Sequence, residues 1–80
     1  MNDKSILDHI HELVAEEKAL RANHRGQGLG ADDRRRLQSL EEQLDQAWDL
    51  LRQRRALEEE GENPDGAAER SVNVVEGYLQ

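Results

Sequence analysis

Apolar residues recur at steps of three and four between residues 3 and 24, which is the spacing of one face of an α-helix. The residues that share this face are Ile6, Leu7, Ile10, Leu13, Val14 and Leu20. The pattern predicts a first helix over about residues 3–24. Its start stays open, because Ser5 with Asp8 can form a capping box while Asn2 and Asp3 are rival caps.

A second helix is predicted over about residues 33–60. Gly61 and Pro64 follow it and end it. Its apolar stripe is formed by Leu37, Leu40, Leu44, Ala47 and Leu51, and is widened by Trp48, Leu50 and Leu57.

The two predicted helices are separated by a glycine-rich stretch. Each glycine costs a helix about 1 kcal/mol, so residues 25–32 are a predicted loop, and Asp32 or Asp33 then caps the second helix. No strand precedes this loop and no lysine follows it in the required place, so a phosphate-binding loop is not expected.

The two stripes fit an antiparallel hairpin that turns at residues 28 and 29, in which facing positions have numbers that add to 57. Only Glu17 opposite Leu40 breaks the apolar ladder. The matching pairs are Leu20 with Leu37, Leu13 with Leu44, Ile10 with Ala47, and Ile6 with Leu51.

The predicted fold class is therefore all-α: a coiled-coil-like hairpin over residues 1–60, followed by a linker and an acidic, extended C-terminal tail over residues 61–80. Eighty residues make a marginal core, and cysteine is absent. We expect a homodimer in which two hairpins form a four-helix bundle. Dimerisation would cover the apolar side chains beside the seam, which are Leu7, Val14, Trp48, Leu50 and Leu57.

The end of the chain regains hydrophobicity after a polar linker. Val72 and Val74 alternate with polar residues as in an extended strand, and Tyr78 and Leu79 follow. Three fates stay open for this segment: docking on its own bundle, adding as a strand to another protein, or remaining undocked. Docking on its own bundle is favoured, because the local effective concentration is high.

Composition and charge predict where the protein is located and which classes of partner it binds. No apolar run approaches the roughly 18 residues of a membrane span, and the charged start leads into no signal-peptide core, so we expect no membrane contact and a cytoplasmic location. The net charge is −7, and residues 58–80 carry seven acidic side chains against one basic. This acidic tail disfavours nucleic acid as a partner.

Two arginine clusters are the main basic features, at residues 34–36 and at Arg52, Arg54 and Arg55. Asp49 lies three residues before Arg52, and two glutamates follow Arg54 and Arg55 at four-residue spacing. These spacings predict charge pairs on the surface of the second helix.

No catalytic residues, metal ligands or cofactor are predicted. The nearest metal motif is Asp8-x-x-His11 with Glu41 or Asp45, but the first two point away from the seam. His9 and His11 face different directions on a helix. His24, near the loop, is expected to cap the first helix and not to act in catalysis.

The leading hypothesis is a non-enzymatic module that binds an unidentified protein. The alternative is an accessory factor that contacts RNA, or a ribosome or RNA polymerase surface, through the arginine clusters; a metal-dependent enzyme comes third. The residues predicted to carry the interaction are Trp48, Arg52, Arg54, Arg55, Val72, Val74, Tyr78 and Leu79.

Three stretches of the sequence resemble an actinobacterial family known as domain of unknown function 2630. They are residues 1–7, residues 75–80, and the specific run Leu-Asp-Gln-Ala-Trp-Asp-Leu-Leu-Arg-Gln-Arg-Arg-Ala at residues 44–56. The resemblance spans the chain and implies no activity. It does imply that the C-terminal ending is a feature of the family.

Overall fold

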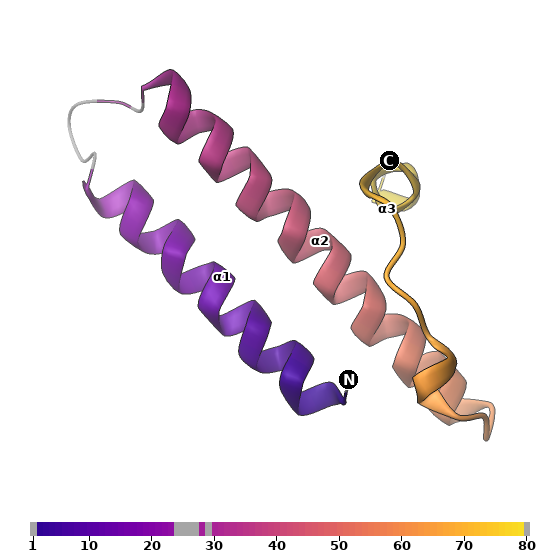
Figure 1. Cartoon of the computed structure of the whole chain (residues 1–80). Coiled ribbons are helices and arrows are strands. Elements are labelled where there is room, and N and C mark those ends of the chain that lie inside the picture. Colours follow the sequence, from indigo (N-terminus) through magenta and orange to yellow (C-terminus); the bar gives the residue numbers. More distant parts are fainter. Residues whose placement is uncertain (1, 24–27, 29, 80) are drawn as a thin grey trace.

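The described residues form three α-helices and one short 3₁₀ helix (Figure 1). The computed structural model describes residues 2–23, 28 and 30–79. The elements are α1 (Asp3–Asn23), α2 (Ala31–Glu59), η1 (Pro64–Gly66) and α3 (Val72–Leu79). These described residues contain no strand, so the all-helical class is confirmed.

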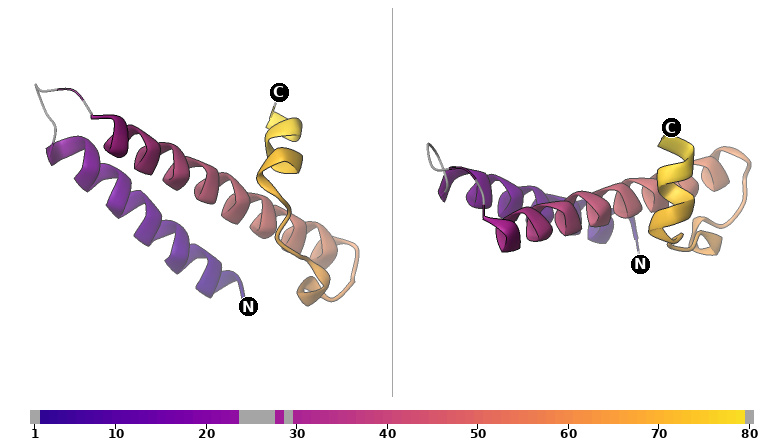
Figure 2. Two further views of the ribbon diagram at one scale, coloured as in Figure 1. Left: turned by 45° about the horizontal axis from the view of Figure 1, so that its top comes forward. Right: turned by 90° about the horizontal axis from the view of Figure 1, so that it is seen from above.

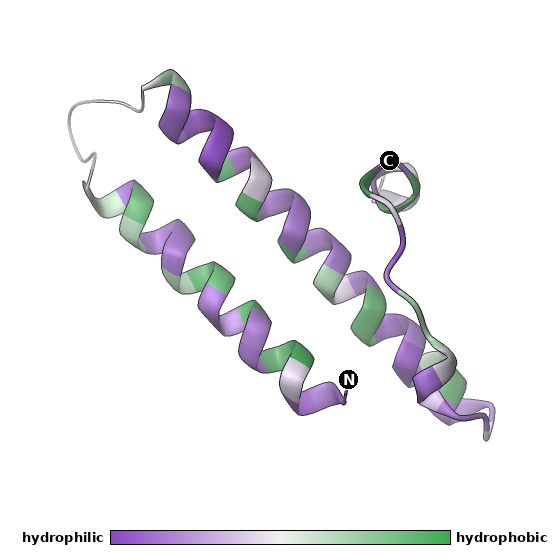
Figure 3. Ribbon diagram, in the orientation of Figure 1, coloured by the Kyte–Doolittle hydropathy of each residue, from purple (hydrophilic) through white to green (hydrophobic). Residues whose placement is uncertain are grey.

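The helices α1 and α2 lie side by side and run in opposite directions (Figure 1). Their facing sides carry most of the apolar residues, while the outer sides are polar (Figure 3). Ile6, Ile10, Ala47 and Leu51 form one buried cluster. This cluster contains both members of two pairs that add to 57.

Burial is uneven along the helix pair. Ile6 and Leu51 are each 1% exposed, whereas Leu20 and Leu37, near the other end, are only half-buried. Leu40 is buried although Glu17 was expected opposite it. The Glu17 carboxylate lies 3.8 Å from Nε of Arg21 in its own helix.

The start of α1 and the end of α2 each have an identifiable cause. Asn2 caps α1, because its Oδ1 accepts a hydrogen bond from the Ser5 amide at 2.8 Å. The predicted caps Asp32 and Asp33 are wrong: α2 starts earlier, after Gly30, which has no side chain to act as a cap. At the other end Gly61 takes φ +77°, and the amides of Gly61 and Glu62 donate to carbonyls of the last turn of α2, which is a Schellman motif.

The prediction of an extended C-terminal tail is wrong, because residues 72–79 form α3. The Ser71 carbonyl accepts a hydrogen bond from the Val75 amide at 3.0 Å. The Ser71 hydroxyl caps the first turn, because it accepts a hydrogen bond from the Val74 amide at 3.4 Å. Val75 is 1% exposed. Val72 and Val75, three residues apart, are the more buried valines of α3, whereas Val74 is 47% exposed.

The C-terminal segment, here residues 62–79, returns along α2, and α3 lies on the side of α2 away from α1 (Figures 1 and 2). Fewer apolar side chains than expected are left for a second copy to cover. Of the five side chains expected to be left exposed beside the seam, only Trp48 is exposed; Leu7, Val14, Leu50 and Leu57 are half-buried. Among the described residues, no helix is long and apolar enough to span a membrane.

Candidate functional site

The predicted interaction residues do not form one surface. Trp48, Arg52 and Arg55 are exposed on α2, and Trp48 keeps 40% of its surface accessible. These three residues share a face through steps of four and three. Because Trp48 lies about 200° around the helix from Gln46, which contacts the C-terminal segment, Trp48 is on the opposite flank.

Arg54 is not part of this surface. It is 7% exposed, and its Nε donates to Asp3 at 2.6 Å. Its Nη1 donates to the Asp65 carboxylate at 2.9 Å and to the Pro64 carbonyl at 3.3 Å. Arg54 therefore joins the start of α1, the end of α2 and η1, in place of the predicted surface pair with Glu58.

The predicted residues at the end of the chain lie on α3. Val74 is 47% and Tyr78 66% exposed, whereas Val72 is half-buried. Leu79 ends the helix. The exposed members of this group are therefore carried by a different element from Trp48.

The first arginine cluster is partly neutralised by carboxylates. Arg35 pairs with Asp32 at 2.5 Å, and Arg36 pairs with Glu16 of α1. Arginines whose donors are occupied in this way are less available for phosphate groups.

A polar stripe on α2 holds the C-terminal segment. Its members Gln46, Asp49 and Gln53 share one face at steps of three and four. The Gln46 amide donates to the Arg70 carbonyl at 3.2 Å, and the Gln53 amide donates to the Ala68 carbonyl at 2.8 Å. Asp49 binds Arg70 and is 3% exposed, so the predicted surface pair with Arg52 is replaced by a buried anchor.

The contact with Arg70 also changes the pKa of Asp49. The hydrogen bond from Arg70 lowers the pKa of Asp49, although burial opposes the shift, and Gln53 and Arg52 lower it further. Tyr78 extends the anchor: its hydroxyl accepts from Arg70 at 3.0 Å, and the guanidinium lies 4.7 Å from its ring centroid.

Sequence reasoning did not find the Asp49 and Arg70 pair. Two signals were available: Arg70 is the single basic residue in residues 58–80, and Gln46, Asp49 and Gln53 form a polar stripe inside the specific run at residues 44–56. Without a fold, nothing indicated that the segment would return along α2.

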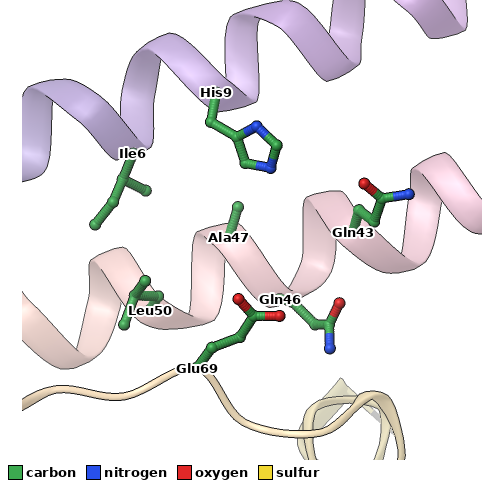
Figure 4. Close-up of a pocket in the computed structure, with 7 residues that line it drawn as sticks. All are labelled: Ile6, His9, Gln43, Gln46, Ala47, Leu50 and Glu69. Atoms are coloured by element: carbon green, nitrogen blue, oxygen red, sulfur yellow. The ribbon is translucent and has the colours of Figure 1, made fainter. Parts of the chain in front are cut away.

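A pocket of about 280 Å³ lies between α1, α2 and the C-terminal segment (Figure 4). Its apolar part comes from the helix seam, and polar groups surround it. The lining residues are Ile6, His9, Gln43, Gln46, Ala47, Leu50 and Glu69. A second, more open groove on α2 is lined by Arg34, Leu37, Gln38, Glu41, Glu42, Asp45 and Glu76.

Carboxylates crowd the second groove. A hydrogen bond with Asp45 raises the pKa of Glu76, and partial burial and the charges of Asp45 and Glu42 add to the effect.

Over the described part of the chain, no group of three or more histidine or carboxylate side chains could hold a metal ion. Asp8, His9 and His11 are exposed on α1, and His24 lies outside the described residues.

The helical architecture alone does not identify a family, whereas comparison with protein families does. Residues 2–80 match the family described as protein of unknown function (DUF2630), and the chain belongs to this family.

Its relatives include uncharacterised proteins of Mycobacterium bovis and of two strains of Mycobacterium tuberculosis. Each is 51% identical over 77 residues, which cover 95% of this chain and 88% of the relative. No solved structure matches the chain significantly.

Proposed function

We propose that the chain is a non-enzymatic protein-interaction module, a helical hairpin that uses the Trp48 flank of α2 to bind protein. The observation that carries this proposal is the 40% exposure of Trp48 on the flank opposite the C-terminal segment. Tryptophan and arginine are the residues most enriched at the energetic centres of protein interfaces, and Arg52 and Arg55 lie beside it.

The first partner that we propose for this flank is a second copy. Two hairpins that pack with their Trp48 flanks together would give a four-helix bundle. Removing a large aromatic side chain from water stabilises such an interface by about 1.5–3 kcal/mol per residue. The exposed residues of α3, Val74 and Tyr78, are left for a different protein.

The alternative of RNA contact has weaker support. Arg35, Arg36 and Arg54 already pair with carboxylates, so three of the six clustered arginines are already engaged. The seven acidic side chains of residues 58–80 also repel phosphate.

Light scattering at micromolar concentration tests the proposal. The full chain should have twice the monomer mass of 9.2 kDa, and Trp48→Lys should give the monomer. Val74→Lys is the matched control, because it places the same charge on an exposed apolar site of α3 and should leave the dimer intact. A monomeric mass for the unaltered chain would refute dimerisation through this flank.

A further inference from the structure

The geometry points to a binding site for an aliphatic cation in the 280 Å³ pocket between α1, α2 and the C-terminal segment: a primary ammonium or guanidinium group on an alkyl stem. The pocket lies on the flank of α2 that carries Gln43 and Gln46, away from Trp48. The inference is therefore independent of the proposed dimer.

The apolar part of the pocket suits an alkyl stem. Ile6 and Ala47 belong to the buried seam, and the half-buried Leu50 lies beside them. The volume is near the lower end of the range for ligand pockets, about 300–1,000 Å³, so it suits a group the size of one side chain.

The polar groups around the stem include several hydrogen-bond acceptors. The amide nitrogen of Gln46 donates to the Arg70 carbonyl, and that of Gln43 donates to the Ser39 hydroxyl at 3.1 Å. Because a carbonyl only accepts, the orientation of Gln46 is fixed. Figure 4 shows the Glu69 carboxylate beside Gln46 and the His9 ring on the opposite wall.

The charge of the pocket selects a cation. Among the described residues that line the pocket, Glu69 brings a negative charge, and there is no lysine or arginine to offset it. Across the described residues, the side chains of Glu69 and His9 take part in no hydrogen bond or ion pair. A bound ammonium group would donate to Glu69 and to the two amide oxygens, which a carboxylate ligand cannot do.

Titration of the ¹⁵N-labelled full chain with n-butylammonium chloride tests the site by NMR. We expect saturable shifts at the side-chain amides of Gln43 and Gln46 and at the Ala47 amide, with a dissociation constant of about 1–10 mM for so small a ligand. Glu69→Gln should weaken binding about two- to fivefold, as expected for an exposed charge pair.

Two controls separate this site from general attraction to an acidic chain. Glu62→Gln gives the same net charge as Glu69→Gln and alters another exposed glutamate of the C-terminal segment, so it should bind as the unaltered chain does. Gln43→Met removes one acceptor at similar volume and should also weaken binding. Unchanged amide shifts at Arg70 and Val75 would show that each variant keeps the segment docked.

The source of the cation is distinguished by two further probes. Tighter binding of N-acetyl-lysine methylamide would assign the pocket to a lysine side chain of a protein, and tighter binding of spermidine would assign it to free amines; either supports the site. Equal affinities of Glu69→Gln and Glu62→Gln, equal shifts with n-butanol, or no saturable shift at Ala47 would each overturn it.

Discussion

The carboxylate of Asp49 on α2 accepts two hydrogen bonds from the guanidinium of Arg70, at 2.8 Å from Nε and 2.6 Å from Nη2. Such bidentate pairs are among the stronger hydrogen bonds in proteins. The pair joins the middle of α2 to the residue that precedes Ser71, the cap of α3. It therefore anchors the C-terminal segment that forms one wall of the pocket.

Replacement of this carboxylate should destabilise the fold. Asp49→Asn keeps the size of the side chain but loses the charge and one acceptor for Arg70, so we expect the free energy of unfolding to fall by about 1–2 kcal/mol. Urea denaturation measures this change. Asp8→Asn, at an exposed position of α1, is the control and should stay within about 0.5 kcal/mol. Equal midpoints for the two variants would contradict an anchoring role.

Acid should remove the contribution of Asp49. Its pKa in the folded chain is below the ordinary value of 3.8, so its stabilising effect is complete above that pH and is lost as the pH falls through the folded value. The stability difference between the unaltered chain and Asp49→Asn should be constant above about pH 5 and shrink below 3.8. Urea titrations from pH 7 to pH 3 check this, and a difference that grows in acid would refute it.

The sequence predicted the parts of the fold that depend on a long apolar period. The faces of α1 and α2 could be read because each contains many leucine and isoleucine residues at helical spacing. The all-helical class followed from them. The register that pairs Ile6 with Leu51 also places Arg54 opposite Asp3, and the structure contains this ion pair. The four-residue spacing within the second helix predicted Glu58 as the partner of Arg54 instead.

The C-terminal segment could not be predicted in the same way. In residues 72–75 valines occur at steps of both two and three, and an eight-residue helix is too short for its period to decide. Valine favours strands, which biased the interpretation towards an extended chain. Packing of Val75 and the anchor at Arg70 are tertiary effects, and the pocket exists only because the segment returns along α2.

Two glycines should respond oppositely to alanine. Gly61 ends α2 at φ +77°, where a Cβ is strained even in open space, so Gly61→Ala should lower the free energy of unfolding by about 1 kcal/mol. Gly77 lies inside α3 with open space around it, so Gly77→Ala should raise that free energy by about 0.5–1 kcal/mol. Urea denaturation of both variants tests the pair, and a destabilised Gly77→Ala would show that α3 does not persist in solution.

Removal of the Glu76 charge should strengthen the docking of α3. Its pKa is raised above the ordinary value of 4.5, so the contribution of Glu76 to stability is present below that pH and is lost as the pH rises through the folded value. At pH 7 the ionised group is repelled by Asp45 and Glu42.

Glu76→Gln should therefore raise the melting temperature at pH 7 and have little effect below pH 4.5. Differential scanning calorimetry at the two pH values measures this. Glu12→Gln, at an exposed position of α1, makes the same charge change away from the groove and should not show the pH-dependent gain. A gain that is equal in both variants would reflect net charge alone.

The neighbours Arg54 and Arg55 should differ sharply in their effect on stability. Arg54→Gln breaks the contacts with Asp3, Asp65 and Pro64, so we expect the melting temperature to fall by at least about 5 °C. Arg55→Gln, one residue further on and exposed, should change it by less than about 2 °C.

A double-mutant cycle then tests the partner of Arg54. Asp3→Asn alone should lower the melting temperature, but in the Arg54→Gln background it should have a much smaller effect, because the ion pair is already broken. Additive effects of the two substitutions would show that Asp3 and Arg54 do not interact in solution. In that case the open end of the helix pair would be held by Asp65 and η1 without the start of α1.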